Sequence, residues 1–281
     1  MSPDIIATLL ILSSAFLHAS WNALVKHAPD KYATVIFATS YCGIMFVPFA
    51  FFVEFPTSTM WAWIASSVAV RLTYQWLAVK SLETNPLTVA YPLSRGMGPL
   101  LVTLFAVFIL HETLPLTSYL GISILILGIL FTLSFKGAEP APSRSALIYP
   151  ILAGSFIAFY TIVDSRAVIN TGDPYAYIVW SGIAFAPATL LAGIMQRGPR
   201  MVTECLSTWR LGLPVAVISN MAYALVLLAY SLGSIAEIAA LRETSIVFAS
   251  LIGFFWLKEK ISKNKLVSIC LIAIGALILK L

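Results

Sequence analysis

Three arginines and one glutamate stand inside long apolar stretches of this sequence: Arg71, Arg95, Arg242 and Glu243. A charge at the centre of a bilayer costs about 3 kcal/mol or more, so such residues are functional candidates. Arginine keeps its proton in proteins and cannot escape this cost by becoming neutral. Glu243 could neutralise one arginine from a neighbouring helix, which is the structural explanation for any single member. Three cations against one carboxylate still leave two positive charges, and we expect an anionic cargo to balance them.

Polar residues recur at helical spacing around these charges. Residues three or four apart share one face of a helix, and a polar face inside a membrane turns toward other helices or water. One such stripe is more often a helix–helix contact than a binding surface, but several together favour a shared cavity. Guanidinium groups match carboxylate and phosphate oxygens, and Tyr and Trp add walls with a polar edge. The predicted substrate-binding residues are Trp21, Asn22, Arg71, Tyr74, Gln75, Tyr91, Arg95, Asn220, Tyr223 and Arg242.

Two titratable residues are candidates for proton coupling. Ionisation of Glu243 would change the charge of the predicted pocket. His18 shares a helix face with Trp21 and Asn22, and the alternative for a lone histidine is a hydrogen-bonding role in packing.

The remaining charged residues have structural explanations. Ser234 and Glu237 have the spacing of a capping box at the start of a helix. Glu112 and Glu259 end two matching stretches, and we expect them to fix the turn into the next helix. Three further residues lie at the ends of predicted spans, where long side chains reach water: Lys26, Asp164 and Arg166.

Composition sets the class of fold. The 281 residues are 60% hydrophobic and only 10% charged, against about 25% charged in soluble domains. A helix of about 20 apolar residues crosses a bilayer, and ten such stretches fill most of the chain. We therefore predict an all-α polytopic membrane protein with ten transmembrane helices. They lie near 4–25, 32–53, 58–80, 87–110, 115–135, 146–165, 174–195, 210–231, 235–257 and 263–280.

The sequence repeats itself. Shifted by 147 residues, "SRGMGPLLVTLFAVFILHETLPLTSYLGISILILGIL" lies over "LRETSIVFASLIGFFWLKEKISKNKLVSICLIAIGAL". Arg95 then matches Arg242, and Gly128 matches Gly275. The first five-helix repeat covers 1–140 and the second covers 141–281, within a single membrane domain. Because five is odd, the second copy enters the membrane from the opposite side. Inverted repeats of this kind are typical of secondary transporters that work by alternating access.

These repeated endings, "HETLPLTSYLGISILILGI" and "LKEKISKNKLVSICLIAIGA", resemble the EamA-type transporters of the drug/metabolite transporter superfamily. The Trp in "HASWNALVK" fits the resemblance, although Asn22 stands where the family more often has Gly. The resemblance implies a basket of helices around a central cavity. It also implies a substrate somewhere among amino acids, sugar phosphates, nucleotide sugars and drugs.

Other classes of protein are disfavoured. The three cysteines, Cys42, Cys205 and Cys270, form no C-x-x-C pair, so we expect no disulfide and no metal site. No catalytic or nucleotide-binding motif stands out, so we expect neither an enzyme nor a cofactor. The net charge of +5 sits in loops beside the membrane, which favours the lipid bilayer and not nucleic acid as a partner. Whether the chain works alone or as a homo-oligomer is left open.

Loop charges predict the orientation. Lysines and arginines gather in the connections after odd-numbered spans, which places those loops in the cytoplasm and both termini outside. The first apolar run is too long for a signal peptide and reads as a span. We predict a short interfacial helix in "QRGPRMVTECLSTWR" and a location in the cell's inner (plasma) membrane.

The function that these features favour is secondary transport, by export or exchange, of a small anionic or zwitterionic metabolite. The alternative is a flippase for a phosphate-bearing lipid carrier, whose head group the same arginines would bind. A structural subunit without cargo is a third, weaker possibility.

Overall fold

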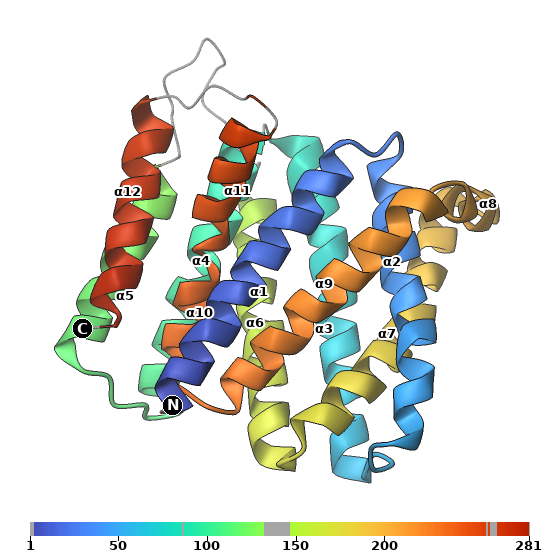
Figure 1. Cartoon of the computed structure of the whole chain (residues 1–281), viewed down its shortest axis with the longest axis horizontal. Helices are drawn as coiled ribbons and strands as arrows, with labels where there is room; N and C mark the ends of the chain where they lie inside the picture. Colours follow the sequence, from blue (N-terminus) through green and yellow to red (C-terminus); the bar gives the residue numbers. More distant parts are fainter. Residues whose placement is uncertain (1–2, 86, 132–146, 257, 259–262, 281) are drawn as a thin grey trace. The chain divides into compact units, whose positions relative to one another are not determined.

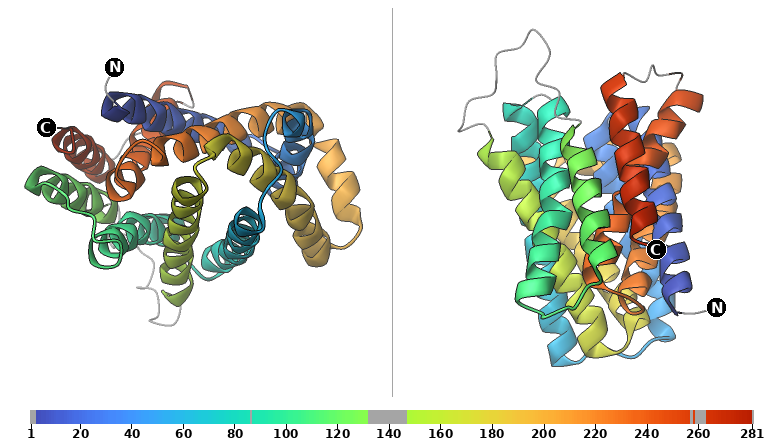
Figure 2. Two further views of the ribbon diagram at one scale, coloured as in Figure 1. Left: turned by 90° about the horizontal axis from the view of Figure 1, so that it is seen from below. Right: turned by 90° about the vertical axis from the view of Figure 1, so that its left-hand side faces the viewer.

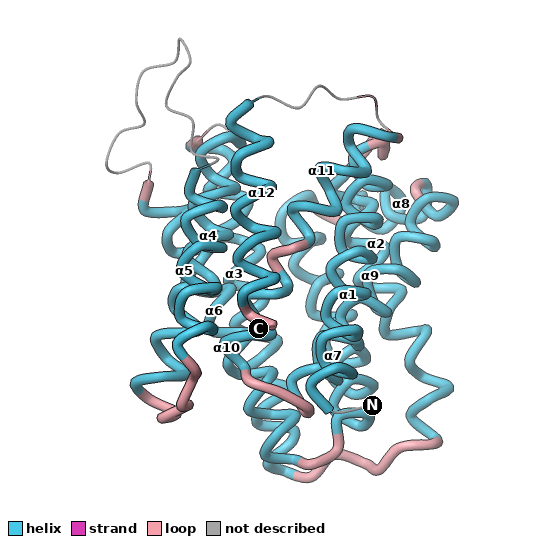
Figure 3. Tube along the Cα trace, turned by 60° about the vertical axis from the view of Figure 1, so that its left-hand side comes forward, coloured by secondary structure: helices cyan, strands magenta, loops and turns pink. Residues whose placement is uncertain are grey.

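The structure is a computed structural model that describes residues 3–85, 87–131, 147–256, 258 and 263–280, with the backbone alone for residues 87–89 and 91. The described residues form helices joined by short loops, and Figure 3 shows no strand among them. The helices are α1 (Pro3–Lys26), α2 (Lys31–Phe46), the 3-10 helix η1 (Val47–Phe51), α3 (Ser58–Thr84), α4 (Leu87–Phe108), α5 (Leu116–Phe131), α6 (Ile148–Thr171), α7 (Pro174–Arg197), α8 (Arg200–Ser207), α9 (Trp209–Tyr230), α10 (Ile235–Arg242), α11 (Ser245–Phe255) and α12 (Lys263–Ile278).

Each of the ten predicted stretches contains an α-helix, which confirms the all-α class. Six helical stretches are long and apolar enough to cross a membrane, and two shorter apolar helices, Pro92–Phe108 and Leu116–Phe131, accompany them. Large apolar side chains are exposed on the helices, such as Leu127 at 61% and Leu277 at 70%. Apolar surface on this scale is expected of helices that face lipid. The protein is a multi-pass membrane protein.

Helices begin where a side chain caps the first turn. Asp30 accepts a hydrogen bond from the backbone N–H of Ala33 at the start of α2, and Asp173 accepts one from Ala176 at the start of α7. Each carboxylate satisfies a backbone donor that has no partner within its own helix. The two aspartates occupy matching places, since the sequence "KYATV" at 31 corresponds to "PYAYI" at 174. The two copies therefore use the same device to start the same helix.

The stretch predicted as one span over 235–257 is two helices. α10 ends at Arg242, Glu243 and Thr244 form a turn, and α11 begins at Ser245. The Thr244 hydroxyl donates to the carbonyl of Leu241, which occupies one of the acceptors at the end of α10. The matching segment of the first copy stays inside α4, which runs from Leu87 to Phe108.

The predicted short helix after 195 is present as α8. Met201 and Cys205 point inward and are buried, whereas Val202 and Leu206 are exposed. This division of faces suits a helix that lies along a surface.

The described chain divides into two compact units, and each draws on both sequence repeats. Unit 1 holds residues 1–72 and 163–232. Within it, α1 lies beside α9, and the Ser14 hydroxyl donates to the carbonyl of Ala222 over 2.6 Å (Figure 1). The α2–α7 pair is also close, because a Cβ on Gly43 would stand 2.5 Å from the Cβ of Ala186.

Unit 2 holds residues 73–162 and 233–281, and α5 and α12 lie side by side in it (Figure 2). A Cβ on Gly121 would lie 2.8 Å from the carbonyl oxygen of Gly275, so these backbones meet directly. About two turns along each helix, the Ser268 hydroxyl donates to the carbonyl of Gly128 over 2.6 Å. Adding 147 to 121 and 128 gives 268 and 275. These are the same contact, made once from each copy.

Glu112 has a different structural role from the predicted one. Its carboxylate accepts from the backbone N–H of Ile235 at 3.0 Å and from the Ser234 hydroxyl at 3.1 Å. It therefore caps the start of α10, a helix distant in sequence, and does not serve only the turn that follows it. Its repeat partner Glu259 lies outside the described residues.

Candidate functional site

One cluster of buried polar groups lies in unit 1, and we call it the Asp164 cluster. The Asp164 carboxylate on α6 accepts from the Ser67 hydroxyl at 2.6 Å, the Arg71 guanidinium at 2.6 Å, and the phenols of Tyr177 at 2.8 Å and Tyr223 at 3.1 Å. Only 2% of its side chain is exposed. Four donors around one carboxylate stabilise its charged form against burial.

The predicted place of Asp164 at a span end is wrong. The stretch expected to end near 165 continues as α6 to Thr171, so Asp164 lies two turns inside the helix. Gly172 follows with a φ of 69°, a left-handed conformation that ends the helix, and Asp173 then caps α7. The Gly-Asp-Pro sequence after Thr171 is the signal that would have placed this helix end correctly.

Arg71 is also held by aromatic rings. Its guanidinium carbon lies 4.0 Å from the ring centroid of Tyr223 and 5.3 Å from that of Phe185. A cation over an aromatic face is attracted to the ring's electrons. Arg71 is thus enclosed by a carboxylate and two rings, and only 14% of its side chain is exposed.

A second cluster lies in unit 2 and consists of Arg95, Arg242 and Glu243. We call it the Glu243 cluster. One terminal nitrogen of Arg95 lies 3.3 and 3.4 Å from the two carboxylate oxygens of Glu243, which confirms one of the pairings considered for this glutamate. The Nε of Arg242 lies 3.8 Å from the same carboxylate. Glu243 is fully buried, while 13% and 12% of the two arginine side chains are exposed.

The break between α10 and α11 suits these charges. Arg242 occupies the last turn of α10, where the helix dipole favours a cation. Glu243 is the C-cap of α10, and Thr244 separates it from Ser245, the first residue of α11. The break therefore gives Arg242 a favourable helix end, and it places Glu243 between the end of one helix and the start of the next.

Two tyrosines accompany the Glu243 cluster. The Arg242 guanidinium carbon lies 5.7 Å from the ring centroid of Tyr160, and the rings of Tyr160 and Tyr74 are 5.7 Å apart. Tyr74 was a predicted site residue, and the structure brings it into this group through Tyr160. The sequence analysis missed Tyr160, because its place beside Arg242 depends on which helices pack against α6.

The two clusters change the count of buried charges. The sequence analysis set three arginines against one carboxylate, but Asp164 is a second buried acid that pairs with Arg71. The surplus of two positive charges is therefore wrong. Arg71 and Asp164 cancel, and the Glu243 cluster carries two guanidinium groups and one carboxylate, a formal charge of +1.

The predicted residues on α1 lie near one another. His18 and Trp21 pack edge to face with ring centroids 5.1 Å apart. Trp21 also packs against the apolar cluster that includes Val25 and Ala38. The side-chain amide of Asn22 donates to the backbone carbonyl of His18. These contacts give each of them a structural role in unit 1, and their binding roles stay predictions.

The remaining predicted residues are placed as follows. Gln75 is half-buried on α3, and Asn220 is half-buried on α9 one turn before Tyr223. Tyr91 is part of α4, but its side chain lies outside the described residues.

Ser234 and Glu237 behave partly as predicted. The Ser234 hydroxyl accepts the backbone N–H of Glu237 and caps α10, which confirms the cap. The Glu237 carboxylate accepts a hydrogen bond from Ser118 and pairs with Lys280 at 3.5 Å. Glu237 thus joins α10 to α5 and to the end of the chain.

Comparison with known proteins agrees with the helical repeats. The sequence matches the EamA-like transporter family twice, over residues 5–134 and 144–281. The chain belongs to this family. Since the family is one of transporters, membership indicates a membrane transporter.

Individual relatives are more distant. The chain is similar to the probable 4-amino-4-deoxy-L-arabinose-phosphoundecaprenol flippase subunit ArnE of Enterobacter sp. (strain 638), with 34% identity over 71 residues. That match covers 25% of this chain and 65% of the flippase subunit. A protein of known crystal structure is 16% identical, with a TM-score of 0.71, over 98% of this chain and 96% of that one. At this identity the likeness shows the fold alone.

Proposed function

We propose that this EamA-family protein is a secondary transporter that exports or exchanges a small anionic or zwitterionic metabolite across the inner (plasma) membrane. In this proposal ten spans form two inverted five-helix repeats, 1–140 and 141–281, and the transporter works by alternating access. Membership of a transporter family and the two family matches support it. Inverted repeats are a common basis of alternating access, because each repeat can adopt the conformation of the other.

The observation that carries the choice of substrate is the sharing of Glu243 by two arginines. One buried carboxylate faces guanidinium nitrogens at 3.3 and 3.8 Å, longer than the 2.6 Å between Arg71 and Asp164. Hydrogen bonds between charged groups are usually shorter than 3 Å, so the contacts of both arginines with Glu243 are long. A substrate carboxylate or phosphate would supply the second negative charge.

The interrupted helix supports the same role. Broken helices in secondary transporters place free backbone groups and helix ends at substrate. Here the break falls at Glu243 and Thr244, directly beside Arg242. We assign Arg95 and Arg242 to anion recognition, Tyr74 and Tyr160 to the walls of the site, and Glu243 to proton coupling.

The other predicted site residues are assigned different roles in this proposal. Since Asp164 and two aromatic rings already hold Arg71, we assign Arg71 and Tyr223 chiefly to the structure of unit 1. Trp21, Asn22 and Asn220 keep their predicted roles in substrate binding, as do Gln75 and Tyr91 in unit 2. His18 stays the alternative candidate for proton coupling.

Transport by the purified protein in liposomes tests the proposal. The assay compares radiolabelled acidic, zwitterionic and cationic metabolites of similar size. We expect uptake of acidic or zwitterionic compounds, and we expect Arg242→Gln to abolish it. Arg210→Gln is the matched control, because Arg210 is an exposed arginine at the start of α9.

Two outcomes would overturn the proposal. Transport of cations alone would contradict the choice of substrate. Normal transport by Arg242→Gln, with correct insertion, would show that the Arg242 guanidinium is not used for binding.

The similarity to a flippase subunit favours a second candidate. A flippase for a phosphate-bearing lipid carrier would use the same arginines for the phosphate. Exchange of a fluorescent polyprenyl phosphate between the leaflets of the same liposomes would separate the two functions. A transporter of soluble metabolites should leave this probe in its original leaflet.

A further inference from the structure

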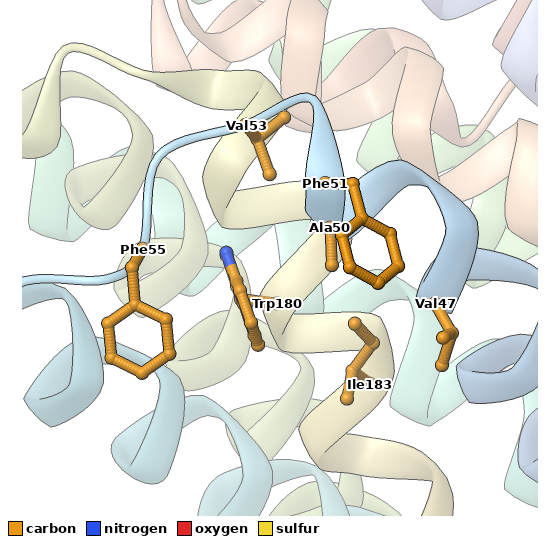
Figure 4. Close-up of a pocket in the computed structure, with 7 residues that line it drawn as sticks. All are labelled: Val47, Ala50, Phe51, Val53, Phe55, Trp180 and Ile183. Atoms are coloured by element: carbon orange, nitrogen blue, oxygen red, sulfur yellow. The ribbon is translucent and has the colours of Figure 1, made fainter.

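Two cavities in unit 1 meet at one residue, Phe55. The first is an apolar groove of about 330 Å³, which runs from Phe55 past Trp180 to Ile183 and Val47 (Figure 4). The second is a polar cup of about 280 Å³. Its polar walls come from Glu54, Thr57, Thr59, Asn170, Thr171 and Asp173. Phe55 lines both, so an apolar cavity and a polar one adjoin at this residue.

The aromatic residues at the junction are already in place. The rings of Phe55 and Trp180 pack edge to face at 5.1 Å, and Trp61 lies 6.0 Å from Trp180. The indole N–H of Trp180 donates to the backbone carbonyl of Glu54 over 3.0 Å. This bond ties the loop before α3 to α7, so the groove is formed without a ligand.

The position of the two cavities matches that of a lipid in one leaflet. The polar cup lies where α6 ends, α7 starts and the loop into α3 passes, so its groups are at helix ends. The apolar groove follows η1 and the first turns of α7 away from these ends. Phe51 beside the groove is 85% exposed, as expected of a side chain that contacts acyl chains. Tryptophan is enriched at this depth of a membrane because its ring is apolar and its N–H is polar.

The chemistry of the cup selects the head group. Glu54 and Asp173 bring two carboxylates, and none of the described residues that line the two cavities is a lysine or an arginine. One carboxylate oxygen of Asp173 accepts a hydrogen bond from the N–H of Ala176, and the second oxygen can accept another. Thr59 and Asn170 add neutral hydrogen-bond donors to the same walls. Carboxylates suit an ammonium group, and the neutral donors suit a phosphate beside it.

We propose that this site binds a bilayer phospholipid whose head group ends in a primary ammonium. The ammonium group lies against Glu54 and Asp173, the phosphate accepts from Thr59 and Asn170, and an acyl chain fills the groove beside Trp180. A primary ammonium donates hydrogen bonds to carboxylates, which a trimethylammonium cannot do. An anionic head group without an amine would be repelled by both acids. This site is independent of the proposed transport function.

Photo-crosslinking in nanodiscs tests the proposal. Three lipids with identical acyl chains carry a diazirine in the chain and differ only in their head group: ethanolamine, choline or glycerol. Labelled peptides are mapped by mass spectrometry. We expect the segments 47–55 and 180–183 to be labelled about fivefold more by the ethanolamine lipid than by the other two, as partly exposed ion pairs allow. The lipid-exposed helix α5 provides the internal reference, since it should show no preference.

Variants make the test specific. Glu54→Gln combined with Asp173→Asn should reduce labelling by the ethanolamine lipid to the level of the glycerol lipid. Asparagine still caps a helix, so α7 should remain folded. Asp30→Asn is the matched control, because Asp30 is the repeat partner of Asp173 and caps α2 in the same way. Equal labelling by all three lipids, or no change in the double variant, would overturn the proposal.

Discussion

The Asp164 cluster and the Glu243 cluster are made of the same chemical groups but are arranged differently. In the first, one arginine meets one carboxylate at 2.6 Å, and a serine and two tyrosines complete its hydrogen bonds. In the second, one carboxylate serves two arginines at 3.3 and 3.8 Å. A neutral cluster whose carboxylate already accepts four hydrogen bonds has little to gain from a ligand. Two arginines that share one carboxylate at longer distances have more to gain from an added anion, so the two arginine sites of similar burial should differ in function.

The largest expected effect comes from removing the acid of the neutral cluster. Asp164→Leu leaves Arg71 buried without its carboxylate, and the free energy of unfolding should fall by about 3–5 kcal/mol. The double variant Asp164→Leu with Arg71→Met should recover most of this loss, because no unpaired charge remains. Chemical unfolding in detergent micelles measures both. A single variant as stable as the wild type would show that the pair is not the structural element we describe.

The rate of transport should depend on the Glu243 cluster and not on the Asp164 cluster, the reverse of their expected ranking for stability. Arg71→Gln combined with Asp164→Asn removes one charge of each sign, and we expect uptake close to that of the wild type. Arg242→Gln removes the surplus charge, and we expect uptake to fall by up to about 100-fold, the equivalent of one strong charged hydrogen bond. Initial rates in liposomes, corrected for the amount of inserted protein, give the comparison. The reverse ranking would assign the substrate to the Asp164 cluster.

The stability of the Glu243 cluster should depend on added anions. Glu243→Gln should cost about 1–3 kcal/mol, less than Asp164→Leu, because glutamine keeps a hydrogen-bond acceptor for the arginines whereas leucine keeps none. A small dicarboxylate or phosphate should raise the melting temperature of this variant more than that of the wild type, since it replaces the missing charge. Thermal shift assays at constant ionic strength measure the effect. An equal shift in both proteins would indicate a nonspecific salt effect.

The exposed ion pair between Asp30 and Arg197 should contribute less to stability than either buried cluster. Burial by itself raises the pKa of Asp30, but the Ala33 N–H and the Arg197 guanidinium lower it more, and its pKa lies below the usual 3.8. The stabilisation is present above pH 3.8 and is lost as the pH falls through the lower folded value. We expect Asp30→Asn to cost about 0.5–1 kcal/mol at neutral pH, as surface pairs do. At a pH below the folded pKa of Asp30, the variant and the wild type should be equally stable in thermal unfolding.

The sequence predicted the helices well because each apolar stretch is long and has its own end signals. It also identified Ser234 as a cap from helical spacing, and it considered Glu243 as a partner for Arg95 or Arg71 without choosing between them. It did not predict the break at 243–244, although the two copies differ there. Gly96-Met97-Gly98 in α4 matches Glu243-Thr244-Ser245 at the break.

Tertiary packing explains why this difference could not be interpreted in advance. A Cβ on Gly98 would lie 3.0 Å from the Ile157 side chain, so glycine there reflects the close approach of α6 to α4. Asp164 and Tyr160 were missed for a related reason. Their roles depend on which helices pack against α6, and the helical period of one segment does not contain that information.

The α5–α12 contact has an implication for the origin of the chain. Position 121 in the first copy touches 275 in the second, and the equivalent position 268 touches 128. A patch that binds its own copy in this reciprocal way is the defining property of an interface between two identical subunits. We infer an ancestor of half the length that formed the α5–α12 contact by pairing with a second copy of itself. Gene fusion then joined the two copies into one polypeptide.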